Sequence, residues 1–111
     1  MHVNQATGEV VETFDGKTFT FKATLSNVAD LCAKLSVDTV GELFKRLHES
    51  NIQALNDSMR YLCISENRDE LRNIRFMPNA GAMIAVFTAT MAAGMPEPKA
   101  TAETYGDDSG N

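Results

Sequence analysis

Histidine and cysteine, the residues that most often carry chemistry, are few in this sequence and stand apart from one another. His2 lies in a polar opening segment without a pattern, and His48 stands near the end of a predicted helix, beside Lys45 and Glu49. A histidine in the last turn of a helix usually complements the helix dipole. Neither histidine is framed by the cysteines or carboxylates of a metal or catalytic site.

The two cysteines, Cys32 and Cys63, belong to no CxxC motif and fall on apolar helical stripes. A free cysteine on such a stripe usually serves as a small buried hydrophobe. Asp107 and Asp108, with Glu103, lack the ligand spacing of an EF-hand and indicate a solvated acidic segment. The sequence therefore predicts no catalytic, cofactor-binding or metal-ligating residue, and we expect a protein that is not an enzyme.

Three arginines give the clearest charged pattern. Arg68, Arg72 and Arg75 are spaced i, i+4 and i+7, which places them along one face of an α-helix. The pattern favours a solvated stripe that neighbouring acids partly neutralise. The alternative is a docking surface for an acidic partner, or for the acidic end of this same chain.

Methionines gather in the last third of the chain, at positions 77, 83, 91 and 95. Methionine side chains adapt to irregular surfaces and are common where a protein binds varied partners, although they also fill cores. Both interpretations stay open for Met91 and Met95. With the aromatic residues of the hairpin and the last helix and the three arginines, the predicted partner-binding residues are Phe19, Phe21, Arg68, Arg72, Arg75, Phe87, Met91 and Met95.

The element that must position the first aromatics is a β-hairpin. Asp15-Gly16 is a favoured type I′ turn between two alternating segments, and a two-residue loop places Val10, Phe14, Phe19 and Phe21 on one face. A lone hairpin is marginally stable in water, so this face must lie on the chain's own helices or on another chain. Both outer edges of a two-stranded ribbon are unpaired, which makes a homo-oligomer built through them a hypothesis.

From Thr24 onward the apolar period changes from two to about three and a half, which indicates helices. Thr24 or Ser26 caps the first, Thr39 and Glu42 form a capping box for the second, and Ser50-Asn51 precedes the third. A short fourth helix covers 68–74, Phe76 to Asn79 form a break because of Pro78, and the last helix runs over 79–93 to a stop at Gly94.

The fold class is therefore α+β, mainly α, with an N-terminal β-hairpin packed on about five short helices and a disordered acidic C-terminal tail. We expect a flexible N-terminus over 1–7, a compact domain over 8–95 (hairpin 8–23, helices 25–94) and a disordered tail over 96–111. The 111 residues carry a net charge of −5, which disfavours nucleic-acid binding. We expect no membrane span and no secretory signal, and therefore a cytoplasmic protein.

The run Gly8-Glu-Val10, then Asp15-Gly-Lys-Thr-Phe-Thr-Phe-Lys-Ala-Thr24, then a helix rich in leucine and alanine resembles tail proteins of tailed phages and gene transfer agents. In that group a "GEV…DGKxYxLRxT" hairpin leads into short helices and an Ala-rich last helix. The resemblance covers 8–95, with later parts at 40–47, 54–64, 68–74 and 80–93. Glu12 stands at an apolar position of the pattern, and Cys63-Ile-Ser-Glu66 lacks the usual turn with His or Gly.

The resemblance implies a tail assembly chaperone, encoded by a phage or prophage and working in the host cytoplasm. Such a chaperone keeps the tape measure protein soluble and brings tail tube subunits to it, and the family has no catalytic residues. Two other hypotheses stay open. The chain is a structural component of the tail, or it is a small bacterial adaptor or regulator that uses Arg68, Arg72 and Arg75.

Overall fold

The Asp15-Gly16 pair makes the tight turn that the sequence predicts. Both residues have positive φ, 51° and 80°, as a type I′ turn requires. Strands β2 (Glu9–Phe14) and β3 (Lys17–Lys22) pair antiparallel across this loop, in the predicted register. The computed structural model describes residues 1–49 and 51–94, so the predicted tail over 96–111 lies outside the described residues.

The apolar face of the hairpin forms the centre of the core. Val10, Phe14, Phe19 and Phe21 are all 0% exposed. The ring centroid of Phe14 lies 6.1 Å from that of Phe19 and 6.3 Å from that of Phe21, separations at which aromatic pairs attract each other. The prediction that these four side chains share one buried face is confirmed.

The opening segment forms a third strand, where the sequence predicts a flexible stretch over 1–7. Strand β1 (His2–Asn4) pairs antiparallel with β2. The connecting turn is held by Asn4, whose side-chain Oδ1 accepts from the amide of Ala6 at 3.0 Å and whose carbonyl accepts from the amide of Gly8 at 2.8 Å. Gly8 has φ 80°, which glycine adopts without strain. These turn contacts, rather than a hydrophobic pattern, order the segment.

The outer edge of β3 is covered by the segment that follows the third helix. Phe21 forms an antiparallel bridge with Cys63, and the amide of Ile64 donates to the carbonyl of Thr20 at 2.8 Å. The amide of Thr20 donates to Oγ of Ser65 at 3.2 Å. The prediction of two unpaired hairpin edges is therefore wrong, because β1 covers β2 on one side and residues 63–65 cover β3 on the other.

Three α-helices follow the sheet, and each begins at a polar cap. They are α1 (Leu25–Leu35), α2 (Val40–His48) and α3 (Ile52–Leu62), with N-caps Thr24, Thr39 and Asn51. Of the two candidate caps for α1, the structure uses Thr24, whose hydroxyl accepts from the amide of Asn27 at 3.1 Å. The predicted capping box of α2 is half formed, because the Glu42 carboxylate accepts from the amide of Asp38 instead of that of Thr39.

The last part of the fold differs from prediction at both of its elements. Residues 68–74 are predicted as an α-helix, but the chain forms the 3₁₀ helix η1 (Arg68–Asn73). Helix α4 (Phe76–Ala93) begins three residues before the predicted start and includes Pro78 in its first turn. The first four amides of a helix have no partner within it, so Pro78 removes no hydrogen bond there and the predicted break is wrong.

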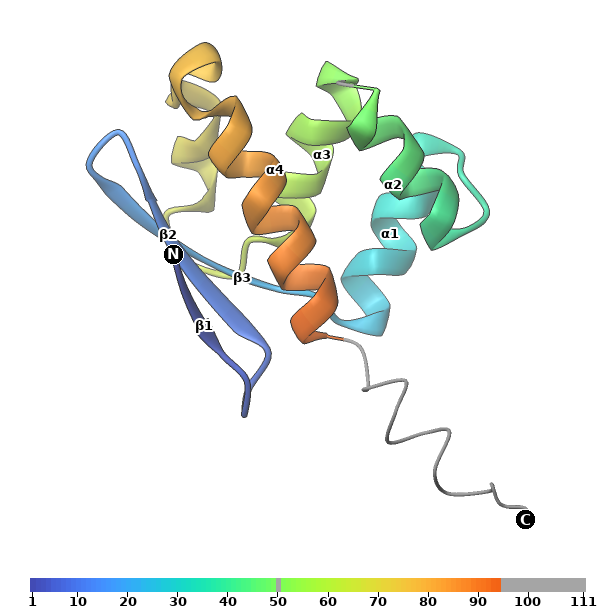
Figure 1. The fold of residues 1–111 in the computed structure, drawn as a ribbon, viewed down its shortest axis with the longest axis horizontal. Coiled ribbons are helices and arrows are strands. Elements are labelled where there is room, and N and C mark those ends of the chain that lie inside the picture. Colours follow the sequence, from blue (N-terminus) through green and yellow to red (C-terminus); the bar gives the residue numbers. More distant parts are fainter. Residues whose placement is uncertain (50, 95–111) are drawn as a thin grey trace.

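Helix α4 lies between the sheet and the other helices (Figure 1). Its buried residues are Met83, Val86, Phe87, Thr90 and Met91, and the ring of Phe87 meets that of Phe44 edge-on at 5.1 Å. With 18 residues and a mean hydropathy of 1.3, α4 is long and apolar enough to cross a membrane. One such helix is weak evidence for a span. Helix α4 buries 28% of its residues, on the face that packs on the sheet and α3, and the compact fold is consistent with a soluble protein.

Candidate functional site

The apolar residues predicted to bind a partner lie in the core. Phe19 and Phe21 are 0% exposed, Phe87 is 1% exposed and Met91 is 3% exposed. Each side chain is covered by other elements of this same chain. The hairpin face therefore packs on the chain's own helices and not on another chain. Met95 lies outside the described residues.

The three arginines do not share one face. A 3₁₀ helix has three residues per turn, so residues spaced by four diverge around it. Arg68 lines a polar cleft and Arg72 lines an apolar groove. Arg75 lies beyond the end of η1 and binds Asp15 in the hairpin turn. The predicted arginine stripe is therefore split among three places.

Asp15 holds Arg75 by three bonds. The backbone amide of Arg75 donates to Oδ2 at 2.8 Å, and its Nη2 and Nε donate to Oδ1 at 2.9 and 3.2 Å. The side-chain amide of Asn79 donates to the same Oδ1 at 3.1 Å. These hydrogen bonds, led by those from the Arg75 side chain, hold the pKa of the Asp15 carboxyl far below its usual range. The contact joins the hairpin turn to the start of α4. The Arg75 side chain therefore has a structural role.

An apolar groove opens where α3, η1 and the start of α4 meet. It encloses about 300 Å³, at the lower end of the range for ligand pockets. Its lining is mostly apolar and contains no acidic side chain; it consists of Ile52, Gln53, Leu55, Asn56, Met59, Arg60, Leu71, Arg72, Ile74, Phe76 and Met83.

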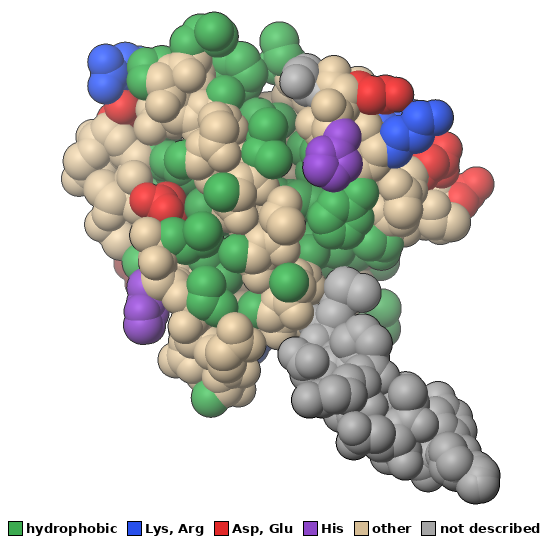
Figure 2. All heavy atoms as spheres, viewed as in Figure 1, with side chains coloured by type: hydrophobic (Ala, Val, Ile, Leu, Met, Phe, Trp, Pro, Cys, Tyr) green, Lys and Arg blue, Asp and Glu red, His purple; other side chains and the backbone are tan. Residues whose placement is uncertain are grey.

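Large hydrophobic side chains stand exposed at the rim of this groove. Ile52 is 65% exposed and Phe76 39%. Met77, the next residue of α4, is 81% exposed but is not among the residues that line the groove. Figure 2 shows hydrophobic side chains gathered at the end of the molecule where α4 begins. Exposed apolar residues that converge on a groove are typical of a protein-binding site.

Sequence reasoning misses these rim residues for two reasons. Ile52 falls within the apolar period of the third predicted helix, but it is the first residue of α3 and is 65% exposed. The predicted break over Phe76 to Asn79 leaves Phe76 outside any helix, so its place in the first turn of α4 is missed. Phe76 two residues before Pro78, at a position that a helix start tolerates, is the signal that identifies it.

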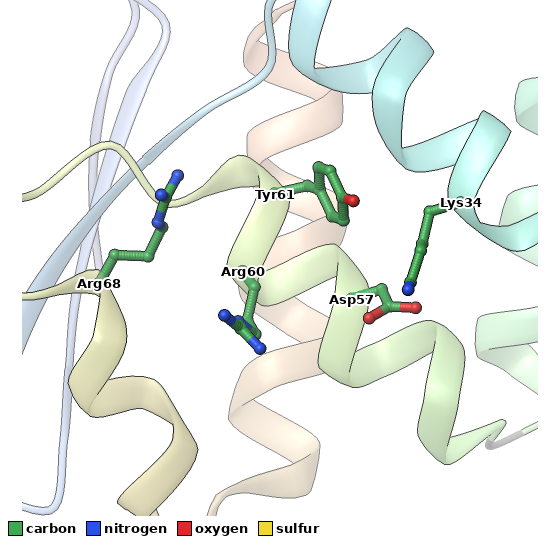
Figure 3. Close-up of a pocket in the computed structure, with 5 residues that line it drawn as sticks. All are labelled: Lys34, Asp57, Arg60, Tyr61 and Arg68. Carbon is green, nitrogen blue, oxygen red and sulfur yellow. The ribbon is translucent and has the colours of Figure 1, made fainter.

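A polar cleft of about 360 Å³ lies beside the groove (Figure 3). Lys34 of α1 and Asp57 of α3 point toward each other across it, whereas Arg60 and Arg68 point away from that pair. The Asp57 carboxylate is buried and accepts from the side-chain amide of Gln53 at 2.7 Å.

This cleft has the character of a binding surface. Three of its five lining residues are cations, which suits carboxylate groups of a partner. Both histidines lie outside its lining. Within residues 1–49 and 51–94, no three His, Cys, Asp or Glu side chains lie close enough together to hold a metal ion.

Each cysteine agrees with the prediction only in part. Cys63 is 1% exposed, as predicted, and its thiol lies 3.2 Å from the Ser65 hydroxyl, but it follows the end of α3 instead of lying on a helix. Cys32 is only half-buried. Burial raises the pKa of the Cys32 thiol, so less of the nucleophilic thiolate is present at neutral pH.

Comparison with known proteins adds no relative: no family model, no curated protein and no solved structure matches this chain. The function is therefore argued from the groove, the cleft and the hairpin motif.

Proposed function

We propose that this protein is a tail assembly chaperone of a tailed phage, prophage or gene transfer agent. It binds the tape measure protein in the host cytoplasm, keeps that protein soluble, and brings tail tube subunits to it. The observation that carries the proposal is the apolar groove between α3, η1 and α4, with Ile52 and Phe76 exposed at its rim.

The groove supports a chaperone role because it offers what a soluble helper for a long helical client needs. An amphipathic helix can lay its apolar side chains into a groove of this kind, with anchors at i, i+3 or i+4. Met59 and Met83 line the groove beside Phe76, and their flexible side chains let the groove adapt to a client. The net charge of −5 keeps such an apolar surface compatible with solubility.

The hairpin supports the same proposal through the motif that carries the resemblance. Asp15 and Gly16 form the two-residue turn of the hairpin, and the strand that follows has the register which such a turn predicts. The Asp-Gly pair also has a structural role here, because Asp15 binds Arg75 and thereby fixes the start of the helix that forms one wall of the groove.

The adaptor hypothesis has less support, because it depends on Arg68, Arg72 and Arg75 acting together. Arg75 is held by Asp15, and the other two line different depressions. The hypothesis of a structural tail component concerns the finished particle, and mass spectrometry of purified particles distinguishes it from a chaperone, which is absent there.

The test is co-expression with a tape measure protein, measuring the soluble fraction of that client. Ile52→Asp with Phe76→Asp places charge at two rim anchors, and we expect the soluble client to fall at least about tenfold, since 1.4 kcal/mol of lost affinity is a factor of ten. Both side chains are exposed, at 65% and 39%, so the chaperone itself should stay folded.

Leu25→Asp is the matched control. Leu25 is 90% exposed at the start of α1, away from the groove, so this change adds one negative charge at an apolar exposed position, against two in the double variant. We expect it to leave the soluble client unchanged. A wild-type chain that neither binds nor solubilises the tape measure protein contradicts the proposed function.

A further inference from the structure

The apolar groove and the polar cleft adjoin at Arg60, which lines both of them. The groove adds Arg72, and the cleft adds Lys34 and Arg68 together with one acid, Asp57, which points toward Lys34. Within the described part of the chain, no ion pair joins any of these four cations to an acid. An otherwise acidic chain therefore presents a basic surface directly beside an apolar one, which fits a ligand with an apolar anchor next to carboxylates.

This chain carries a segment with that chemistry after α4. We propose that residues 103–108, Glu-Thr-Tyr-Gly-Asp-Asp, bind back onto the groove and cleft of the same molecule. Tyr105 is the apolar anchor and enters the groove beside Ile52. Its flanking carboxylates face the cations, so that charge-assisted hydrogen bonds form on both sides of the anchor.

The length of chain after Gly94 permits this contact. Helix α4 begins at the groove with Phe76 and has 18 residues, so its far end lies about 27 Å away at 1.5 Å per residue. The eleven residues 95–105 span up to about 36 Å when extended. Tyr105 therefore reaches the groove along α4 with a small excess of chain, and the acids after it reach the cleft.

The consequence is self-competition for the groove. A tethered segment has an effective concentration on the order of millimolar, which is enough to populate a contact of modest affinity. A client with several apolar anchors displaces it. Binding of residues 103–108 to the groove does not depend on the proposed function. Competition between this segment and a client rests on that function.

The experiment compares the full chain with a full-length variant whose proposed segment is neutralised. The variant carries Glu103→Gln, Tyr105→Ala, Asp107→Asn and Asp108→Asn, and the measurement is the amide chemical shifts of a ¹⁵N-labelled protein. We expect shift changes at the groove and cleft residues named above, Ile52 and Arg60 among them, while those of the sheet stay fixed. Raising the salt from about 0.05 to 0.5 M should move the wild-type shifts toward those of the variant, because ions screen surface charge.

Glu97→Gln is the matched control, since it neutralises an acid of the same terminal segment outside 103–108. It should leave the groove shifts unchanged. Equal shifts in wild type and variant, or the same change with Glu97→Gln, overturn the proposal. Groove shifts that vary with protein concentration, together with a dimer mass by light scattering, assign the groove to a second copy and also overturn it.

The two proposals fail in different measurements. If the segment occupies the groove about two-thirds of the time, neutralising it tightens client binding about threefold. A client that binds neither protein refutes the chaperone function and leaves the shift result standing. A client that binds both proteins equally, with no shift difference at the groove, refutes the docking and leaves the chaperone function standing.

Discussion

At the scale of single residues, Asp15 joins the hairpin turn to the start of α4 by four hydrogen bonds, three from Arg75 and one from Asn79. Its folded-state pKa lies below the ordinary value of about 3.9. A carboxyl with a depressed pKa stabilises the fold above its unfolded pKa, and that stability is lost as the pH falls toward the folded pKa. Acid therefore weakens this link.

We predict that Asp15→Asn lowers the Tm at pH 7, because asparagine fits the turn but carries no charge for Arg75. The difference in Tm from wild type should shrink as the pH falls from about 5 toward 2. Asp30→Asn is the control, since Asp30 is exposed on α1 and no hydrogen bond or ion pair joins it to another described residue. A Tm difference that is constant with pH contradicts the charged role of Asp15.

At the scale of elements, the cap of α1 is a reciprocal pair. The Thr24 hydroxyl accepts from the Asn27 amide, and the Asn27 side chain accepts from the Thr24 amide at 2.8 Å. We predict that Thr24→Ala lowers the free energy of unfolding by about 1 kcal/mol, the usual value for a lost N-cap. Ser26→Ala, the other candidate cap, should cost less than about 0.5 kcal/mol. Urea titration measures both, and equal losses contradict the assignment of the cap.

The elements also show what the sequence can and cannot predict. Asp15-Gly16 specifies its own turn and, through the period-two pattern, the register and the buried face of the hairpin. Local polar caps such as Thr24 and Asn51 locate helix starts. The 3₁₀ form of 68–73 escapes prediction because an α-helix and a 3₁₀ helix share the same composition, and only packing against α3 distinguishes them.

At the scale of the whole molecule, the core and the proposed binding surface are separate sets of hydrophobic residues that the sequence does not distinguish. Phe21 and Ile52 both stand in apolar patterns, yet Phe21 is 0% exposed and Ile52 65%. The groove depends on where α3, η1 and α4 converge, which no local pattern encodes. Arg60 lines both the groove and the cleft, and this too depends on the assembled fold.

This separation yields a direct prediction. Phe21→Ala should lower the free energy of unfolding by about 3–5 kcal/mol, the usual cost of truncating a buried phenylalanine. That is a large part of the roughly 5–15 kcal/mol that holds a domain together. Ile52→Ala should change it by less than about 0.5 kcal/mol. Denaturation midpoints test both, and a larger loss from Ile52→Ala than from Phe21→Ala would reverse the assignment of core and rim.

The coverage of β3 by residues 63–65 decides how copies of this chain can join through their sheets. An open polymer needs two different, complementary surfaces on each subunit, so that the first surface of one copy binds the second surface of the next. Among the described residues the sheet has one free side, which runs along His2–Asn4 and, beyond β1, along residues 12–14 of β2, which β1 does not pair. Two copies that pair along this side occupy it in both, so strand addition there favours a closed twofold pair over a fibre.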